Sequence, residues 1–130
     1  MTTRSYNFDK EVTRIARPDS LNTDVFYGGP NSLAGQPKRM TYDGGMITFF
    51  FDTTKGLMTG IVSPTGDSLL YTYDGQLAKS IRWTGGVRGS VIYRYNNDML
   101  IASETVNSTD SVTYTYDNDG IVKSAGVMKL

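Results

Sequence analysis

The segment Leu69–Asp74 reads Leu-Leu-Tyr-Thr-Tyr-Asp, and in an extended strand its first leucine and both tyrosines share one face. Three other segments repeat this order of an aliphatic residue, two aromatic residues at alternate positions and a final Asp or Asn: Ile47–Asp52, Val91–Asn96 and Val112–Asp117. The last aromatic residues of the four segments lie 22, 22 and 21 positions apart. A period of this length indicates a repeat architecture in which each copy is one supersecondary unit.

A turn and a second strand follow each aromatic segment. The turns are rich in Gly, Asn and Asp, as in Asn118–Gly120, and an aliphatic residue such as Leu77 or Leu100 then restarts the alternation. A second turn closes the copy, as Ser63–Gly66 does. Each copy therefore predicts one β-hairpin and its connection to the next.

Two weaker copies precede these four. Tyr6–Asp9 keeps the aromatic pair and the Asp, whereas Val25–Gly28 keeps less of the pattern. The stretch Gly28–Lys38 predicts a longer loop, and Met40–Met46 predicts an additional tight turn. We expect a single domain over residues 1–130, with repeats near residues 4–22, 23–46, 47–66, 67–90, 91–110 and 111–130.

The composition favours the same fold. Val, Ile, Thr, Phe, Tyr and Trp total 47 of the 130 residues, whereas Ala occurs five times and Glu twice. This mixture favours strands joined by tight turns over helices. The predicted fold class is all-β: an antiparallel meander of about six successive β-hairpins that forms a twisted, curved strip of sheet.

The chain has neither Cys nor His, and 13 basic and 13 acidic residues leave no net charge. These absences exclude Ser-His-Asp and Cys-His nucleophilic sites, Cys/His zinc sites and disulfides. The balanced charge gives no electrostatic signature of nucleic-acid binding, and no apolar run approaches the roughly 20 residues of a membrane-spanning helix. The first residues lack the apolar core of a signal peptide. We therefore expect no catalytic residues, metal, cofactor, nucleic-acid partner or membrane span.

The repeated Tyr-x-Tyr-Asp, followed by a Gly/Asn turn and an aliphatic residue, resembles the YD repeats of Rhs proteins, of the C component of Tc toxin complexes and of teneurins. Tyr71–Leu77 and Tyr114–Ile121 carry the resemblance best, and Tyr6–Asp19 resembles a form that ends in Arg-Pro-Asp-Gly. The resemblance covers roughly residues 6–124. The second copy departs from it, because Gly28 stands where the family has Asp.

In that family, the hairpins line up into a strip of β-sheet that spirals into a hollow shell around a toxin or another polypeptide. The resemblance implies that this chain is a non-catalytic, structural piece of shell wall. It also implies that the partners are the rest of a larger YD-repeat shell or copies of the chain joined at sheet edges. The implied location is secreted or at the cell surface, as part of a larger protein.

The repeat assigns structural roles to its own motif residues. The aromatic residues should form one core face, the Leu residues should fill the gaps between rings, and each Asp or Asn should fix its turn by accepting backbone N–H groups. These repeat-motif residues are Phe8, Asp9, Phe49, Phe51, Asp52, Tyr71, Tyr73, Asp74, Leu77, Tyr93, Tyr95, Asn96, Leu100, Tyr114, Tyr116 and Asp117.

Trp83 ends a predicted strand beside Thr84–Gly86 and is the candidate for ligand stacking. The alternative function is therefore a carbohydrate- or protein-binding module of a secreted or cell-surface protein. The competing interpretation places Trp83 at the edge of the core.

Four polar or glycine-rich patterns have both a functional and a structural interpretation. Asp52 and Asp74 would suit a hydrolase that uses a carboxylate pair, but the recurrence of Asp favours turn capping. The stretch Asp117–Gly120 resembles the start of a calcium loop and lacks the later Glu of an EF-hand. Asn107–Thr109 is a glycosylation sequon on a predicted turn. Gly85–Gly89 lacks the Lys-Ser/Thr of a phosphate loop and predicts a hairpin connection.

Overall fold

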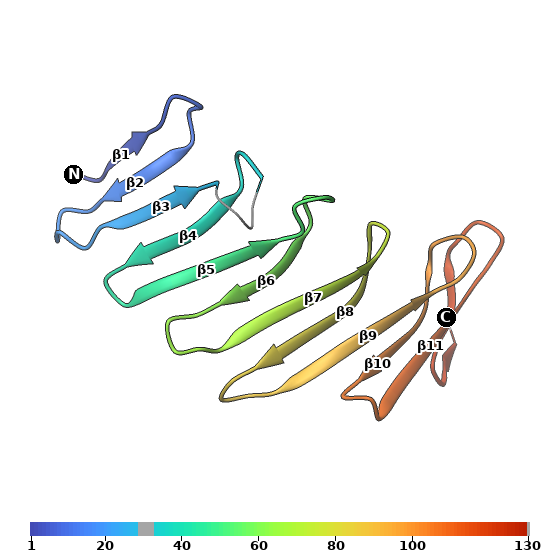
Figure 1. Ribbon diagram of the computed structural model, residues 1–130. Coiled ribbons are helices and arrows are strands. Elements are labelled where there is room, and N and C mark those ends of the chain that lie inside the picture. The colour runs from blue at the N-terminus through green and yellow to red at the C-terminus, as the bar shows by residue number, and fades with distance from the viewer. Residues whose placement is uncertain (29–32, 130) are drawn as a thin grey trace. The chain divides into compact units, whose positions relative to one another are not determined.

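The computed structural model describes residues 1–28 and 33–129. The chain divides into two compact units, Met1–Leu70 and Tyr71–Leu130. Figure 1 shows the strands, which are β1 (Thr3–Tyr6), β2 (Val12–Ala16), β3 (Thr23–Tyr27), β4 (Pro37–Tyr42), β5 (Gly45–Phe51), β6 (Met58–Val62), β7 (Ser68–Asp74), β8 (Leu77–Thr84), β9 (Gly89–Tyr95), β10 (Ile101–Val106), β11 (Asp110–Tyr116), β12 (Val122–Ala125) and β13 (Met128–Lys129).

Within each unit, the strands follow one another in the sheet in chain order, and each strand pair is antiparallel. The described residues contain no helix. The prediction of an all-β, antiparallel hairpin meander is therefore confirmed. The two-residue strand β13 follows the sixth hairpin. The curvature predicted for the sheet stays a prediction.

A β-bulge recurs at one position of the repeat. The last aromatic residue before the turn pairs with the first residue of the next strand, as Tyr95 does with Ile101, and the register then shifts by one residue. The shift follows the same kind of pair in four other hairpins, at Tyr6–Val12, Tyr27–Pro37, Phe51–Met58 and Tyr116–Val122. Because a bulge bends its strand and increases the local twist, each of these hairpins bends at the same place.

An Asp or Asn closes the turn that follows the aromatic segment. The N–H of Asn96 donates to the carbonyl of Leu100 over 2.9 Å, and its Oδ1 accepts the N–H of Leu100 over 2.9 Å. Asp117 makes the same two bonds with Ile121 at 2.9 and 2.8 Å. The residue that pairs with the capping residue in this way is called the closing residue below.

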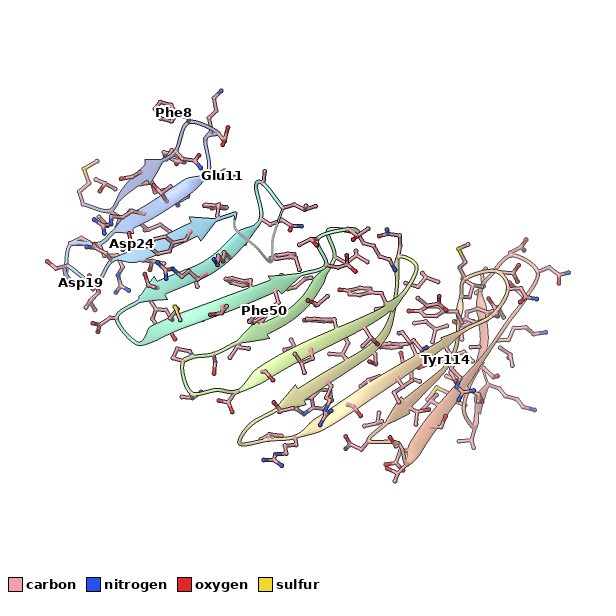
Figure 2. All side chains as sticks on the ribbon, in the orientation of Figure 1. Phe8, Glu11, Asp19, Asp24, Phe50 and Tyr114 are labelled. Carbon is pink, nitrogen blue, oxygen red and sulfur yellow. The ribbon has the colours of Figure 1, made fainter. Side chains whose placement is uncertain are left out.

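The first hairpin lies two residues earlier than the sequence predicts. Asn7, not Asp9, holds the capping position, because its N–H donates to the carbonyl of Glu11 and its Oδ1 accepts the N–H of Glu11. Phe8 lies at the tip of the turn, fully exposed, and does not join the aromatic face (Figure 2). Tyr6 takes the place that the sequence assigns to Phe8.

The apolar pattern of β2 explains this register. With Glu11 as the closing residue, Ile15 lies four positions later and pairs with Arg4, on the face that Tyr6 occupies. A turn capped by Asp9 would place Arg17 at that position instead. A two-residue slip leaves each side chain on its face but changes its cross-strand partner, so the observed register keeps the aliphatic Ile15, and not Arg17, at this position.

The connection between β3 and β4 is shorter than the predicted loop over Gly28–Lys38, because β4 already begins at Pro37. The N–H of Gly28 donates to the carbonyl of Gln36 over 3.1 Å, which fixes the ends of the connection. Part of that loop, residues 29–32, lies outside the described residues. The additional tight turn is present between β4 and β5, where Tyr42 pairs with Gly45.

The aromatic face is open rather than packed as a core. No hydrophobic side chain in the described residues is buried, and the motif tyrosines are half-buried. The sequence predicted that this face forms a core, and this prediction fails because the sheet is a single layer. Each ring has neighbours on the adjacent strands, but no second layer of the described residues covers it. The opposite face of the second unit carries hydroxyl pairs, such as Thr115 with Ser124 at 2.6 Å.

Candidate functional site

The motif residues fall on corresponding places of the successive hairpins. Strand β5 holds Phe49 and Phe51 with Asp52 after it, β7 holds Tyr71, Tyr73 and Asp74, Leu77 begins β8, β9 holds Tyr93 and Tyr95 with Asn96 after it, Leu100 precedes β10, and β11 holds Tyr114 and Tyr116 with Asp117 after it. Within the second unit, this places the tyrosines of β9 and β11 on one face of the sheet.

A tyrosine hydroxyl links successive hairpins. The last tyrosine of an aromatic segment donates to a backbone carbonyl in the second strand of the preceding hairpin. In the hairpins closed by Glu11 and Leu100, the acceptor is the residue directly after the closing residue. The three bonds are Tyr27 to Val12 (3.0 Å), Tyr95 to Ala78 (2.7 Å) and Tyr116 to Ile101 (2.8 Å). Ile101 and Val12 are also the residues at which the bulge begins, so the hydroxyl reaches the backbone at the bend.

Glu104 interrupts the apolar face in the second unit. It pairs with Tyr93 of β9 on one side and with Val112 of β11 on the other, so its side chain shares their face. The position lies four residues after Leu100, the closing residue. Its equivalents in the other hairpins are all apolar: Ile15, Met40, Ile61, Ile81 and Ala125.

Three tyrosines surround the Glu104 carboxylate. The hydroxyl of Tyr114 donates to Oε2 of Glu104 over 3.3 Å. Burial, and then the nearby Glu104 charge, raise the pKa of Tyr114; burial, the Tyr93 hydroxyl and Glu104 raise the pKa of Tyr95. We call Tyr93, Tyr95, Glu104 and Tyr114 the tyrosine–glutamate cluster.

Among the described residues, no basic side chain forms an ion pair with Glu104. In the part of the chain that the structure describes, the ion pairs are Arg14–Asp24 and Arg17–Asp19, both in the first unit. The carboxylate is half-buried, and its hydrogen bond comes from a neutral phenol. The cluster therefore presents an uncompensated negative charge among aromatic rings.

Neither a protein-family model nor a curated protein matches this chain. Among residues 1–28 and 33–129, no helix is long and apolar enough to cross a membrane.

Glu104 is not among the candidate residues that the sequence predicts. A signal for it was present, because the fourth position after Leu57, Leu77 and Ile121 is aliphatic or Ala. Glu104 is one of only two glutamates in the chain, and it replaces the apolar residue that the repeat has at this position. This departure becomes visible when the second strands of the hairpins are aligned on their closing residues.

The aspartates of the turns use their carboxylates locally. Oδ1 of Asp52 accepts the N–H groups of Thr54 and Lys55 at 2.8 and 2.9 Å, and these bonds hold the pKa of Asp52 below its usual value. Oδ1 of Asp117 accepts the N–H of Asp119 over 2.9 Å as well as that of the closing residue. In the described segments, no three acidic side chains are grouped to hold a metal ion.

Trp83 lies near the end of β8 and is half-buried. It pairs with Gly89 of β9, and a Cβ atom at Gly89 would collide with the indole ring. The indole therefore packs over the glycine backbone. A shallow hollow beside it is lined by Arg82, Arg88 and Asn107.

Asn107 of the sequon has a structural contact. Its Oδ1 accepts the N–H of Ser90, and its own N–H donates to the carbonyl of Ser90, both over 2.9 Å. The residue has a positive φ of 49° in the turn between β10 and β11. The side chain thus ties this turn to the start of β9.

The first unit carries a polar cluster on the face opposite Tyr27. Arg14 of β2 makes two bonds to the carboxylate of Asp24 in β3, at 2.5 and 2.9 Å. The guanidinium of Arg39 lies 4.1 Å from the ring centre of Phe26. Exposed pairs of this kind contribute little stability, and within the cluster Arg14 and Asp24 compensate one another's charge.

Proposed function

We propose that this chain is a non-catalytic structural repeat module, a segment of β-sheet wall whose aromatic face is covered by a polypeptide. The observation that carries the proposal is the open aromatic face, on which no hydrophobic side chain of the described residues is buried. A single sheet layer needs a second layer over its apolar side. The resemblance to the shells of YD-repeat proteins agrees with this assignment.

The tyrosine hydroxyl bonds between successive hairpins support a sheet that continues over many repeats. Tyr95 bonds to Ala78, and Tyr116 bonds to Ile101, so these two links use equivalent acceptors on successive hairpins. Arrays of this kind draw their stability from nearest-neighbour contacts, which lets hairpins be added without a new type of contact. The partners that fit are the rest of a larger shell, or copies of this chain, at the sheet edges.

The proposal includes a secreted or cell-surface location within a larger protein. This part rests on the resemblance to the YD-repeat family, whose members act there. It is tested by where the full-length protein is found in fractionated cells and medium.

Two matched lysine substitutions test whether the aromatic face is a contact surface. Val91 lies on this face beside Ile81, whereas Thr113 lies on the other face of the neighbouring hairpin. When no other polypeptide is present, we expect copies of the wild-type chain to cover one another's aromatic face as the concentration rises. Val91→Lys should weaken this face-to-face association and Thr113→Lys should retain it, as measured by light scattering after size exclusion. Equal effects of the two substitutions would contradict the proposal.

Carbohydrate binding at Trp83 is the second candidate function. The hollow beside the indole ring, with Arg82 and Arg88 in its lining, favours it, because an aromatic ring and polar donors together suit a sugar. Saturable glycan binding that is lost in Trp83→Ala would support this function. Its absence from a broad glycan panel would eliminate it.

A further inference from the structure

At the position four residues after the closing residue, Glu104 is a charged residue where the other hairpins have an apolar one. Ile15, Ile61 and Ile81 hold the equivalent position in three other hairpins. A carboxylate there contributes less cross-strand packing than an aliphatic side chain. Its presence is therefore not explained by the stability of the sheet.

Covering the face changes the energetics of this carboxylate. In the free chain Glu104 is half-buried and reaches water, so its charge is tolerated. A polypeptide lying on the face would remove that water, and a buried carboxylate without a partner is strongly unfavourable. An occupant that brings a positive charge to this point lets the carboxylate stay ionised when the face is covered.

The rings around Glu104 favour the same charge. The cross-strand partner Tyr93 and the hydrogen-bonded Tyr114 place aromatic rings on both sides of the carboxylate. The faces of such rings attract cations, and the attraction grows when water is excluded. One carboxylate with flanking rings is a combination suited to a cation and unsuited to an anion or a purely apolar group.

We propose that the tyrosine–glutamate cluster receives the guanidinium group of an arginine side chain carried by the polypeptide that covers the aromatic face. This inference rests on the proposed function, because it names a feature of the covering polypeptide. A guanidinium group is planar, stacks on aromatic rings and donates to a carboxylate at the same time. The hydrogen bond from Tyr114 uses Oε2, so Oε1 of Glu104 is the principal acceptor left for the guanidinium group.

The test is an NMR titration that observes tyrosine ring signals of the full chain. The probes are N-acetyl-arginine amide, its neutral isostere N-acetyl-citrulline amide and N-acetyl-lysine amide. Each is added up to about 100 mM, which covers millimolar dissociation constants. A fourth probe, the peptide acetyl-Leu-Arg-Leu-amide, adds apolar side chains beside the arginine.

The matched variants are Glu104→Ile and Glu11→Gln. Glu104→Ile restores the residue found in three other hairpins, so it should fold at least as well as the wild type. Glu11→Gln removes the only other glutamate, in the first unit, and should leave the response unchanged.

We expect the arginine probe to shift the ring signals of Tyr93 and Tyr114 saturably, with an affinity about fivefold or more above that of citrulline. We expect the Leu-Arg-Leu peptide to bind about tenfold more tightly than the single residue, since its leucines cover the rings. The response should vanish in Glu104→Ile. No response in the wild type, or an undiminished one in Glu104→Ile, overturns the proposal.

Two further outcomes test the guanidinium group and the polypeptide source separately. An equal affinity for lysine overturns the guanidinium assignment, and equal binding of the peptide and the single residue overturns a polypeptide as the source. The proposed function fails separately, in the light-scattering comparison of Val91→Lys with Thr113→Lys. Association through the aromatic face without an arginine response would refute this inference alone.

Discussion

The hydroxyl of Tyr116 donates to the backbone carbonyl of Ile101, which is the residue that pairs with Tyr95 in the preceding hairpin. Tyr95 in turn donates to Ala78, one hairpin earlier. Each tyrosine thus belongs to its own strand and also fixes the backbone of the hairpin before it. This explains why tyrosine, and not only an aromatic ring, recurs at the last position of the segment.

Replacing Tyr116 by Phe should destabilise the chain by about 1 kcal/mol, because it removes this bond and leaves the carbonyl of Ile101 without it. Urea unfolding of the chain gives the free energy of unfolding. Tyr93→Phe is the control, because the Tyr93 hydroxyl makes no hydrogen bond to another described residue. A loss at Tyr93 as large as at Tyr116 would show that the hydroxyl link is unimportant.

Met99 should be a stabilising site for glycine. It has a left-handed φ of 63° and directly precedes the closing residue, where the equivalent hairpin has Gly120 with a φ of 77°. Met99→Gly should raise the free energy of unfolding by roughly 1 kcal/mol, because a left-handed residue with a Cβ atom is strained. Thermal unfolding measures the change. Gly120→Ala should lower stability by a similar amount, and a neutral result for both substitutions would refute the argument.

Gly89 and Trp83 should be energetically coupled. Gly89→Ala brings a Cβ atom into the indole ring and should cost about 1–3 kcal/mol. In a Trp83→Ala background the same change should cost far less, because the ring is gone. A double-mutant cycle by urea unfolding tests this coupling, and additive effects would mean that the glycine serves the backbone alone.

The tyrosines should make the fold sensitive to alkaline pH. The pKa values of Tyr95 and Tyr114 are raised above their usual value of about 10, chiefly by burial and also by Glu104. Because folding raises these pKa values, their contribution is fully present below about pH 10 and is lost as the pH rises through the raised values. Unfolding experiments with a parallel tyrosinate absorbance titration should show both changes.

Glu104→Gln tests whether the Glu104 carboxylate contributes to the raised pKa of Tyr114. Removing the negative charge should move the pKa of Tyr114 down toward its usual value, while burial of the ring is unchanged. An unaltered titration of Tyr114 in the variant would show that the carboxylate does not contribute.

Much of the fold follows from the sequence, because period and turn chemistry are local properties. The aromatic segments, the turn residues Asn96 and Asp117 and the all-β class are all readable from neighbouring residues. The recurring bulge and the Tyr116 hydroxyl link are not, because they depend on how two strands are registered in space. The same limit explains the first hairpin, where Tyr6-Asn7 and Phe8-Asp9 match the local pattern almost equally well.

The candidate site was the less predictable part. Functional motifs in the sequence favour Trp83 and the aspartates. Glu104 stands out only when it is compared with the apolar residues at the equivalent position of the other hairpins. Its relation to Tyr93 and Tyr114 is a cross-strand relation over 10 or 11 residues, and strand pairing is required to see it.

Hydroxyl-radical footprinting of Tyr93 and Tyr114 at increasing protein concentration tests the central claim most directly, namely that the aromatic face is open in the single chain and covered in its assembly. Both rings should be modified readily at low concentration and become protected as the chains associate, while Thr113 on the other face stays equally accessible. Rings that are already protected in the monomer, or that stay open in the associated state, would contradict the account.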